Sequence, residues 1–287
     1  MTLPDVSIGA LTLGGRALWM ASMVGAILII SGISVFLSRR QVLITRWVTW
    51  AIIVPVVGIP LWLGYPTTVA LAIIISLQAI REFSMLTDLP KPETFILLAL
   101  SVAYPFIAWQ APSSMTIAPL LVLVCAFPSL LRGDTHRGIT VAALTGFGSI
   151  WIPWSLAHLV VVWHDAFMIA FAAAGADVAA WCGGQGLKRF SWARRSLSPL
   201  SPNKTWGGFV GTLLGAALIL ALIGDFHVGV VLAVGIGAVA GDLLESMLKR
   251  GVGVKDAGSW LPGFGGLLDR VDSLLLVLPL VAYEGMW

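Results

Sequence analysis

The stretch that decides the fold is a pair of apolar runs with a short connection, WGGFVGTLLGAALILALIGDFHVGVVLAVGIGAVAGDLLESMLKR, residues 206–250. The two runs, about residues 206–224 and 227–248, can each cross a bilayer core about 30 Å thick, which takes about 20 residues of α-helix. The whole chain has this character, with 58% of its 287 residues hydrophobic and 11% charged. Because soluble domains carry about 25% charged residues, the sequence predicts an all-α polytopic membrane protein.

Glycines recur along these two runs at the spacing of one helical turn. Gly207, Gly211 and Gly215 lie four residues apart in the first run, and Gly237 and Gly241 do so in the second. Small residues on one face allow the backbones of membrane helices to approach closely. We therefore expect the helices that flank the two largest charged loops to lie close together.

Similar apolar runs occupy most of the chain. The first lacks a convincing small-residue cleavage site, so it is interpreted as a retained span and not as a signal peptide. The third run is short and the second and fourth are rich in proline, so we expect about nine to ten transmembrane helices. The candidates are about residues 17–38, 47–64, 66–80, 94–110, 114–131, 138–163, 165–182, 206–224, 227–248 and 270–286.

Basic residues fall on alternate connections between these spans. Every Lys and Arg except Arg16 follows an odd-numbered span. By the positive-inside rule the odd connections face the cytoplasm, and the expected location is a prokaryotic cell (inner) membrane. These basic residues are Arg39, Arg40, Arg46, Arg81, Lys91, Arg132, Arg137, Lys188, Arg189, Arg194, Arg195, Lys204, Lys249, Arg250, Lys255 and Arg270.

The cysteine content excludes some classes of site. Cys125 and Cys182 lie far apart in apolar stretches, which argues against a disulfide scaffold and against a cysteine zinc cluster. The lipid bilayer is the expected environment, and no nucleic-acid partner is expected.

Two cytoplasmic loops are long and rich in charge. The first, WCGGQGLKRFSWARRSLSPLSPNKTWGG, covers residues 181–208. A basic segment of this kind is attracted to anionic lipid headgroups, by about 1 kcal/mol per basic residue. Its SPLSPNKTWGG end suggests a second interpretation, a fixed turn that brings Lys204 to the mouth of the next span.

Acidic residues stand within or at the ends of predicted spans, where ionisable groups are costly and indicate function. They are Asp177, Asp242 and Glu245. Asp242, Glu245, Ser246 and Lys249 share one helical face. A Glu245–Lys249 pair on an exposed helix is worth only a few tenths of a kcal/mol. This pair leaves the Asp242 carboxylate without a partner, so we expect a cation to bind there.

The second loop, residues 245–273, offers partners for such a cation. Asp256, Asp269 and Asp272 are the expected co-ligands of Asp242. A group of carboxylates without thiols favours a hard ion such as Mg²⁺. Whether the site also binds a second cation is left open. The segment at Gly265 and Gly266 has little side chain, so its backbone and the following helix N-terminus are expected to approach phosphate oxygens. The basic residues expected to contact phosphates are Lys249, Arg250, Lys255 and Arg270.

These residues favour a Mg²⁺-dependent phosphate-transfer site at the cytoplasmic membrane surface. A transporter with intramembrane carboxylates that bind ions remains an alternative. The chain has no GxxxxGK[ST] motif in a strand context, and it has no Rossmann fingerprint.

The second loop also carries a resemblance to a known family. The order of Ser246-Met-Leu-Lys-Arg, Lys255-Asp256 and Pro262-Gly-Phe-Gly-Gly-Leu-Leu-Asp-Arg-Val-Asp272 resembles the signature of phosphatidate cytidylyltransferases, also called CDP-diacylglycerol synthases. Gly241-Asp-Leu-Leu-Glu-Ser246, Ser201-Pro-Asn-Lys-Thr-Trp206 and the surroundings of Asp177 are similar to that family too. The resemblance covers roughly the last 110 residues. It divides the chain into an N-terminal transmembrane region, residues 1–164, and a cytidylyltransferase-like catalytic region, residues 165–287.

The resemblance implies an enzyme that transfers CMP from CTP to phosphatidic acid or a related lipid phosphate, giving CDP-diacylglycerol and pyrophosphate. It implies a metal group of Asp242, Asp256, Asp269 and Asp272, with Lys249 and Lys255 also catalytic. Lys204, Ser246, Arg250, Arg270, Gly265 and Gly266 would contact the substrates, and Asp177 is a further candidate. Relatives tend to dimerise, so a homodimer is possible, although packing within one chain explains the glycines equally well.

Three positions depart from the family pattern. Phe264 stands where the family usually has histidine, Gly207 where it usually has an acidic residue, and Asn203 where lysine is common. Phenylalanine cannot donate to a phosphate or exchange a proton. Two further hypotheses therefore accompany the first: a divergent enzyme for another lipid phosphate or nucleotide, and a binding partner of low or no activity.

Overall fold

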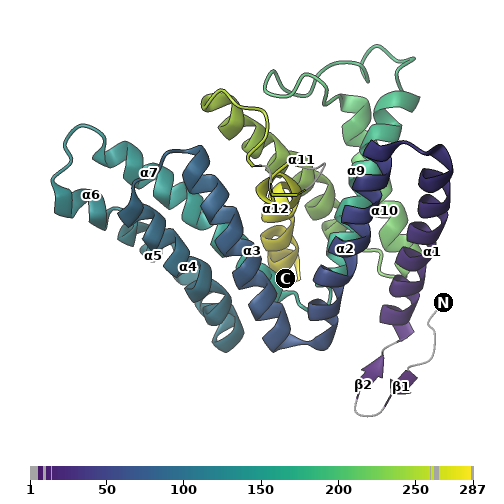
Figure 1. Cartoon of the computed structure of the whole chain (residues 1–287), viewed down its shortest axis with the longest axis horizontal. Helices are drawn as coiled ribbons and strands as arrows, with labels where there is room; N and C mark the ends of the chain where they lie inside the picture. Colours follow the sequence, from purple (N-terminus) through teal and green to yellow (C-terminus); the bar gives the residue numbers. More distant parts are fainter. Residues whose placement is uncertain (1–5, 9–10, 14, 259, 262–264, 286–287) are drawn as a thin grey trace.

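The structure is a computed structural model that describes residues 6–8, 11–13, 15–258, 260–261 and 265–285. It is a bundle of helices, as the sequence predicts (Figure 1). Among the described residues, the β structure is a short antiparallel hairpin of β1 (Val6–Ile8) and β2 (Leu11–Leu13). The helices are α1 (Gly15–Ser38), α2 (Gln41–Leu63), α3 (Tyr65–Leu86), α4 (Lys91–Gln110), η1 (Pro112–Ile117), α5 (Ala118–Val124), α6 (Phe127–Arg132), α7 (Gly138–Ser149), η2 (Ile150–Trp154), α8 (Ser155–Val161), α9 (Ala166–Gly186), α10 (Trp206–Ile223), α11 (Val228–Gly251) and α12 (Leu268–Glu284).

Eight helices in the described part of the chain are long and apolar enough to cross a membrane, with α7, η2 and α8 forming one of them. The predicted fifth span, residues 114–131, is instead divided among η1, α5 and α6. Pro128 stands in the first turn of α6, where a new helix begins because proline lacks the backbone N–H group that would continue the preceding helix. The predicted tenth span forms α12, which has 17 residues. The chain is therefore an integral membrane protein, and its described residues include eight helices that are long and apolar enough to span a bilayer.

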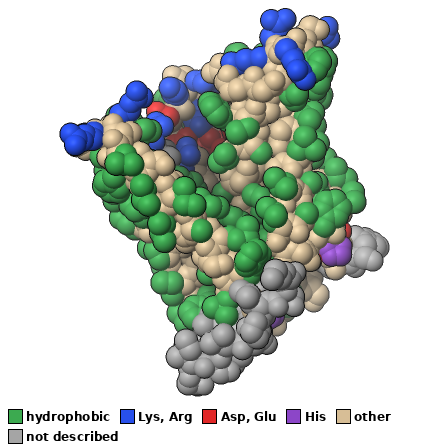
Figure 2. All heavy atoms as spheres, turned by 90° about the vertical axis from the view of Figure 1, so that its right-hand side faces the viewer, with side chains coloured by type: hydrophobic (Ala, Val, Ile, Leu, Met, Phe, Trp, Pro, Cys, Tyr) green, Lys and Arg blue, Asp and Glu red, His purple; other side chains and the backbone are tan. Residues whose placement is uncertain are grey.

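The connections that carry the basic residues lie at one end of this bundle. The α1–α2, α3–α4, α6–α7, α9–α10 and α11–α12 connections are all at the upper end in Figure 1. The face drawn in Figure 2 has its Lys and Arg side chains at the same end, around a hollow with acidic side chains, above a surface that is largely hydrophobic. The charge alternation in the sequence thus corresponds to two distinct ends of the molecule.

The predicted glycine faces lie at the closest helix contacts. A Cβ atom added to Gly211 or Gly215 would overlap with Ala179 of α9, and one added to Gly241 would overlap with the backbone of Asp272 in α12. A Cβ atom on Gly237 would lie 3.0 Å from Val277 of α12. The prediction that the helices flanking the two large loops pack closely is therefore confirmed, and this packing sets the position of α11 against α12.

We expect Gly211→Ala to destabilise the bundle by about 1–3 kcal/mol, the usual cost of inserting a group into a close-packed contact. Thermal unfolding of the purified protein in detergent would measure this. Gly25→Ala in α1 is the matched control, since no described residue beyond its own turn of helix lies within 4 Å of a Cβ atom there. Equal unfolding temperatures for the two variants would contradict the close α9–α10 contact.

Candidate active site

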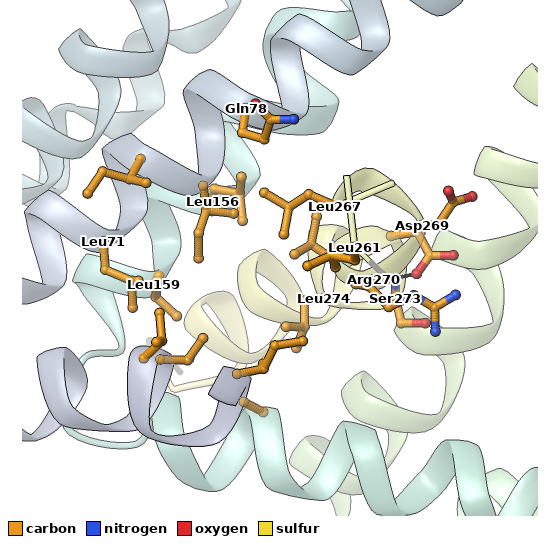
Figure 3. A pocket seen from close by; sticks show the side chains of 18 of the residues that line it. Leu71, Gln78, Leu156, Leu159, Leu261, Leu267, Asp269, Arg270, Ser273 and Leu274 are labelled. Carbon is orange, nitrogen blue, oxygen red and sulfur yellow. Dashed lines mark hydrogen bonds between the residues drawn. The ribbon is translucent and has the colours of Figure 1, made fainter. Parts of the chain in front are cut away.

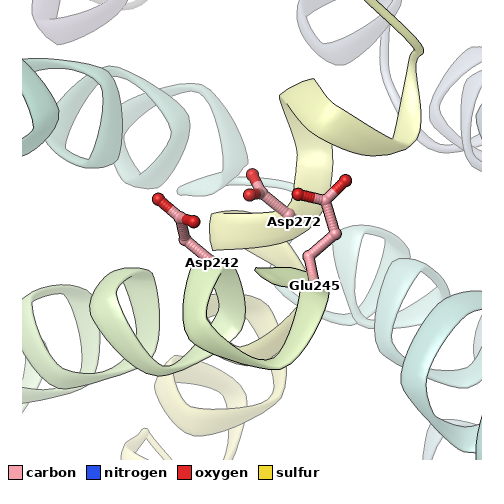
Figure 4. A group of neighbouring side chains, drawn as sticks. All are labelled: Asp242, Glu245 and Asp272. Atoms are coloured by element: carbon pink, nitrogen blue, oxygen red, sulfur yellow. The ribbon is translucent and has the colours of Figure 1, made fainter. Parts of the chain in front are cut away.

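Three carboxylates from α11 and α12 meet near the charged end of the bundle (Figure 4). Asp242 and Glu245 are three residues apart on α11, and Asp272 faces them from α12 because Gly241 lets the two backbones approach. One oxygen from each of the three carboxylates lies within 4.8 Å of the others. Glu245 is only 1% exposed and Asp272 only 7%. Three carboxylates this close in a buried site repel one another unless cations lie between or beside them.

The first large loop brings one cation to this cluster. The backbone amide of Leu197 donates to the carbonyl of Lys204 at 2.7 Å, and Thr205 caps α10 by accepting from the amide of Gly208. The turn places the Lys204 ammonium in an ion pair with Asp242. Ser246 also donates to the Asp242 carboxylate, at 3.3 Å. The expected turn that presents Lys204 at the mouth of α10 is therefore present.

A second cation, the ammonium group of Lys249, lies beside Glu245. Lys249 pairs with Glu245 and, at 2.7 Å, with Asp269. Asp269 also accepts the backbone amides of Ala257 at 3.0 Å and Gly266 at 2.8 Å. Its carboxylate therefore organises the second loop around the start of α12.

The predicted ligand set thus divides into two groups. Asp242 and Asp272 lie together with Glu245, whereas Asp269 lies with Lys249 and the loop amides. Asp256 and Lys255 are exposed on the loop. Glu245, which the sequence analysis named among the acidic residues of the spans but did not include in the metal group, belongs to the cluster. One of its oxygens, Oε1, is buried without a hydrogen-bond partner among the described residues.

The remaining predicted contacts are spread around this centre. Arg250 is exposed and donates to the carbonyl of Val254 at 3.2 Å. Arg270 is exposed at the start of α12. Gly265 has a positive φ of 83°, which glycine adopts readily. Phe264 lies outside the described residues.

Glu82 of α3 also reaches this region, and the sequence analysis missed it. Its carboxylate accepts the backbone amides of Leu267 at 3.0 Å and Leu268 at 2.8 Å, at the N-terminus of α12. It is 1% exposed. The amides at this helix start, which were expected to approach phosphate, therefore face protein carboxylates. A glutamate directly after a predicted span was the only local signal.

A large cavity adjoins the cluster. Its volume is about 1420 Å³, and it is bounded by residues from α2, α3, α8, α9 and α12. Figure 3 shows leucines such as Leu71, Leu156 and Leu159 around its apolar part, with Asp269 and Arg270 at the other side. The further polar residues of its lining include Gln78, Arg81, Asp177 and Asp272. A long apolar chain and an anionic headgroup could therefore occupy one continuous space.

Comparison with known proteins identifies the family. The model of the cytidylyltransferase family matches residues 44–285. The chain belongs to the cytidylyltransferase family. The match extends well beyond the region in which the sequence motifs were recognised, and it includes Glu82 and the helices that line the cavity.

Individual members of this family are similar to parts of the chain. A phosphatidate cytidylyltransferase of Haemophilus influenzae is 40% identical over 108 residues, which cover 32% of this chain and 37% of the relative. The chloroplastic phosphatidate cytidylyltransferase 4 of Arabidopsis thaliana is 38% identical over 151 residues, 48% of this chain and 37% of the relative. One from Mycobacterium leprae is 35% identical over 149 residues, 47% of this chain and 46% of the relative. The alignments thus span less than half the length of these relatives.

Proposed function

We propose that this protein transfers CMP from CTP to a lipid phosphate, with phosphatidic acid as the substrate, and releases pyrophosphate. The observation that carries the proposal is the continuity between the apolar cavity and the carboxylate cluster. A cavity of about 1420 Å³ exceeds the 300–1,000 Å³ of common ligand pockets, as an acyl-bearing substrate requires. Relatives named phosphatidate cytidylyltransferase support the same substrate pair.

Asp242, Glu245 and Asp272 fit a bound Mg²⁺. They offer only oxygen ligands, which hard cations prefer, and the buried Glu245 Oε1 atom lacks a partner among the described residues. A bound Mg²⁺ would supply positive charge to the phosphate oxygens of CTP. We therefore assign Asp242, Glu245 and Asp272 as the residues that would bind Mg²⁺. Asp269 positions Lys249 and the loop, and Asp256 stays a candidate for a second cation.

The chemistry proposed is an in-line displacement at phosphorus. An oxygen of the lipid phosphate forms a bond to the α-phosphorus of CTP, and the bond between that phosphorus and the oxygen bridging to the β-phosphate breaks. Lys204, beside the carboxylate cluster, and Arg270, in the cavity lining, are the side chains we assign to contact the phosphates. Ser246, Lys255, Arg250 and the glycines at 265 and 266 remain candidates for nucleotide contacts. Catalysis then rests on positioning and electrostatic stabilisation.

The charged end of the bundle is proposed to face the cytoplasm. The Lys and Arg residues other than Arg16 lie in or next to the connections at this end, as the positive-inside rule predicts, and CTP is a cytoplasmic nucleotide. The location would then be a prokaryotic inner membrane. A homodimer stays a prediction.

The direct test is to incubate the purified full-length protein with CTP, Mg²⁺ and phosphatidic acid in mixed micelles and to measure pyrophosphate. We expect release that requires all three components. A panel of other lipid phosphates and nucleoside triphosphates in the same assay distinguishes a divergent specificity. No release with any member of the panel, while a phosphatidate cytidylyltransferase of known activity works, would contradict the proposal.

A binding partner without turnover is the second candidate, and Phe264 is the observation that favours it. Phe264→His should raise the rate strongly only if the unaltered chain is nearly inactive. Gly207, where the family usually has an acidic residue, is less suitable for restoring the family pattern, because an added side chain would also disturb the packing. A Cβ atom there would lie 3.1 Å from the Ala193 side chain and 3.3 Å from the Gly183 carbonyl, so Gly207→Glu is expected to disturb the α9–α10 packing.

Filling the apolar cavity should weaken lipid binding selectively. Ala174→Phe on α9 places a ring in the cavity lining, and we expect KM for phosphatidic acid to rise by about tenfold or more, since small changes of volume in an apolar pocket have effects of this size. KM for CTP should change little. Leu214→Phe on the exposed face of α10 is the control. Equal lipid KM values for the two variants would argue against this cavity as the lipid site.

A further inference from the structure

The N-terminus of α12 is capped by a side chain from a distant part of the chain. The helix begins at Leu268, and its own N-cap residue, Leu267, has no side chain that can accept a hydrogen bond. Glu82 of α3 accepts the amides of both residues instead. The positive end of the α12 dipole favours a carboxylate at this place.

The glycines of the second loop make room for this carboxylate. A Cβ atom on Gly266 would lie 2.5 Å from Glu82 Oε2, and one on Gly258 would lie 3.3 Å from Glu82 Oε1. Gln78, one turn earlier on α3, donates to Glu82 Oε1 at 3.0 Å. The carboxylate is therefore enclosed by the loop on one side and by its own helix on the other.

We propose that Glu82 is a positioning residue that fixes the start of α12, so that Asp272 faces Asp242 and Glu245. Leu268, which Glu82 binds, precedes Asp272 by one helical turn. A shift of the first turn of α12 would therefore move Asp272 out of the carboxylate cluster. The inference rests on the proposed function for its kinetic consequence, whereas the structural role does not depend on any substrate.

Glu93 of α4 separates a positioning role from a merely structural one. It too is a buried carboxylate near the charged end, but its partners are Ser129 and Arg132 of α6. Neither partner belongs to the second loop or to α12. Glu93→Gln is therefore the matched control for Glu82→Gln. In both variants glutamine keeps the shape of the side chain but replaces one hydrogen-bond acceptor by a donor.

The first readout is hydrogen exchange of the full-length protein in nanodiscs, followed in peptides that cover residues 265–272. We expect Glu82→Gln to accelerate exchange of the Leu267 and Leu268 amides at least tenfold, and Glu93→Gln to leave them unchanged. If Glu82→Gln does not fold, Glu82→Asp, with its shorter reach, is measured in the same way. Unchanged exchange in the Glu82 variant, or equal acceleration in both variants, would overturn the proposal.

The second readout is the Mg²⁺ concentration for half-maximal pyrophosphate release. Residues that orient metal-binding groups change affinity or activity by about 10–100-fold, so we expect Glu82→Gln to raise this concentration about tenfold. A loss of folded protein alone would lower the maximal rate and leave the half-maximal concentration unchanged, and that result would overturn the positioning role. Absence of activity in the unaltered protein would contradict the proposed function, and the exchange result would still decide the role of Glu82.

Discussion

Asp272→Asn should lower CTP-dependent pyrophosphate release about 10³-fold, the upper range for loss of one preorganised electrostatic group. Asp272 is 7% exposed and lies within the carboxylate cluster with Asp242 and Glu245. The substitution keeps the size of the side chain but removes its charge. The rate constant at saturating CTP and lipid measures the effect.

The same variant, which loses activity, is not expected to lose stability. In the absence of Mg²⁺, Lys204 and Lys249 balance only two of the four charges of Asp242, Glu245, Asp269 and Asp272. Removing one negative charge should therefore preserve or raise the unfolding temperature. Mg²⁺ should stabilise the unaltered protein, because a ligand that binds only the folded state stabilises it by about 2.7 kcal/mol at 100 times Kd. It should stabilise Asp272→Asn much less.

Asp225→Asn, in the α10–α11 connection at the opposite end of the bundle, is the control for both measurements. It should retain the activity and the Mg²⁺ stabilisation. Full activity in Asp272→Asn would contradict the assignment of this cluster as the site of chemistry.

Lys249→Met should destabilise the protein by about 3–5 kcal/mol, because breaking a buried ion pair leaves uncompensated charge. The Lys249 side chain is 12% exposed and pairs with two carboxylates, Glu245 at 1% and Asp269 at 4% side-chain exposure. Methionine fills a similar volume without a charge. Equilibrium unfolding in mixed micelles measures the loss.

Two companion variants test the cause of this loss. Adding Glu245→Gln to Lys249→Met should recover part of the stability, since one of the two buried charges is removed. Lys255→Met, at an exposed position of the same loop, should change stability by no more than about 0.5 kcal/mol. A loss as large for Lys255→Met as for Lys249→Met would contradict the buried ion-pair arrangement.

Local patterns in the sequence were enough to predict much of this fold. Length and hydrophobicity located the spans, and four-residue glycine spacing identified the faces of α10 and α11 that pack closely. The fifth span was predicted as continuous because its apolar length concealed the effect of its prolines. A hydrophobic count alone does not show where a run is divided into short helices.

The site was only partly predictable, because burial and long-range contacts decide the roles of its residues. The i,i+4 spacing of Glu245 and Lys249 suggested an exposed pair of small value, whereas both side chains are largely buried beside α12. The motif suggested four aspartates as one group, yet Asp269 binds loop amides and Lys249. Glu82 bonds to a backbone 185 residues away, which no local pattern can reveal.

The most direct test of the proposed activity is to follow the label of CTP. With CTP labelled at the α-phosphorus, we expect the label in a CDP-lipid that appears only with phosphatidic acid and a divalent cation. With CTP labelled at the γ-phosphorus, we expect the label only in pyrophosphate. Transfer of the γ-label to lipid, or no labelled lipid in either experiment, would contradict the account.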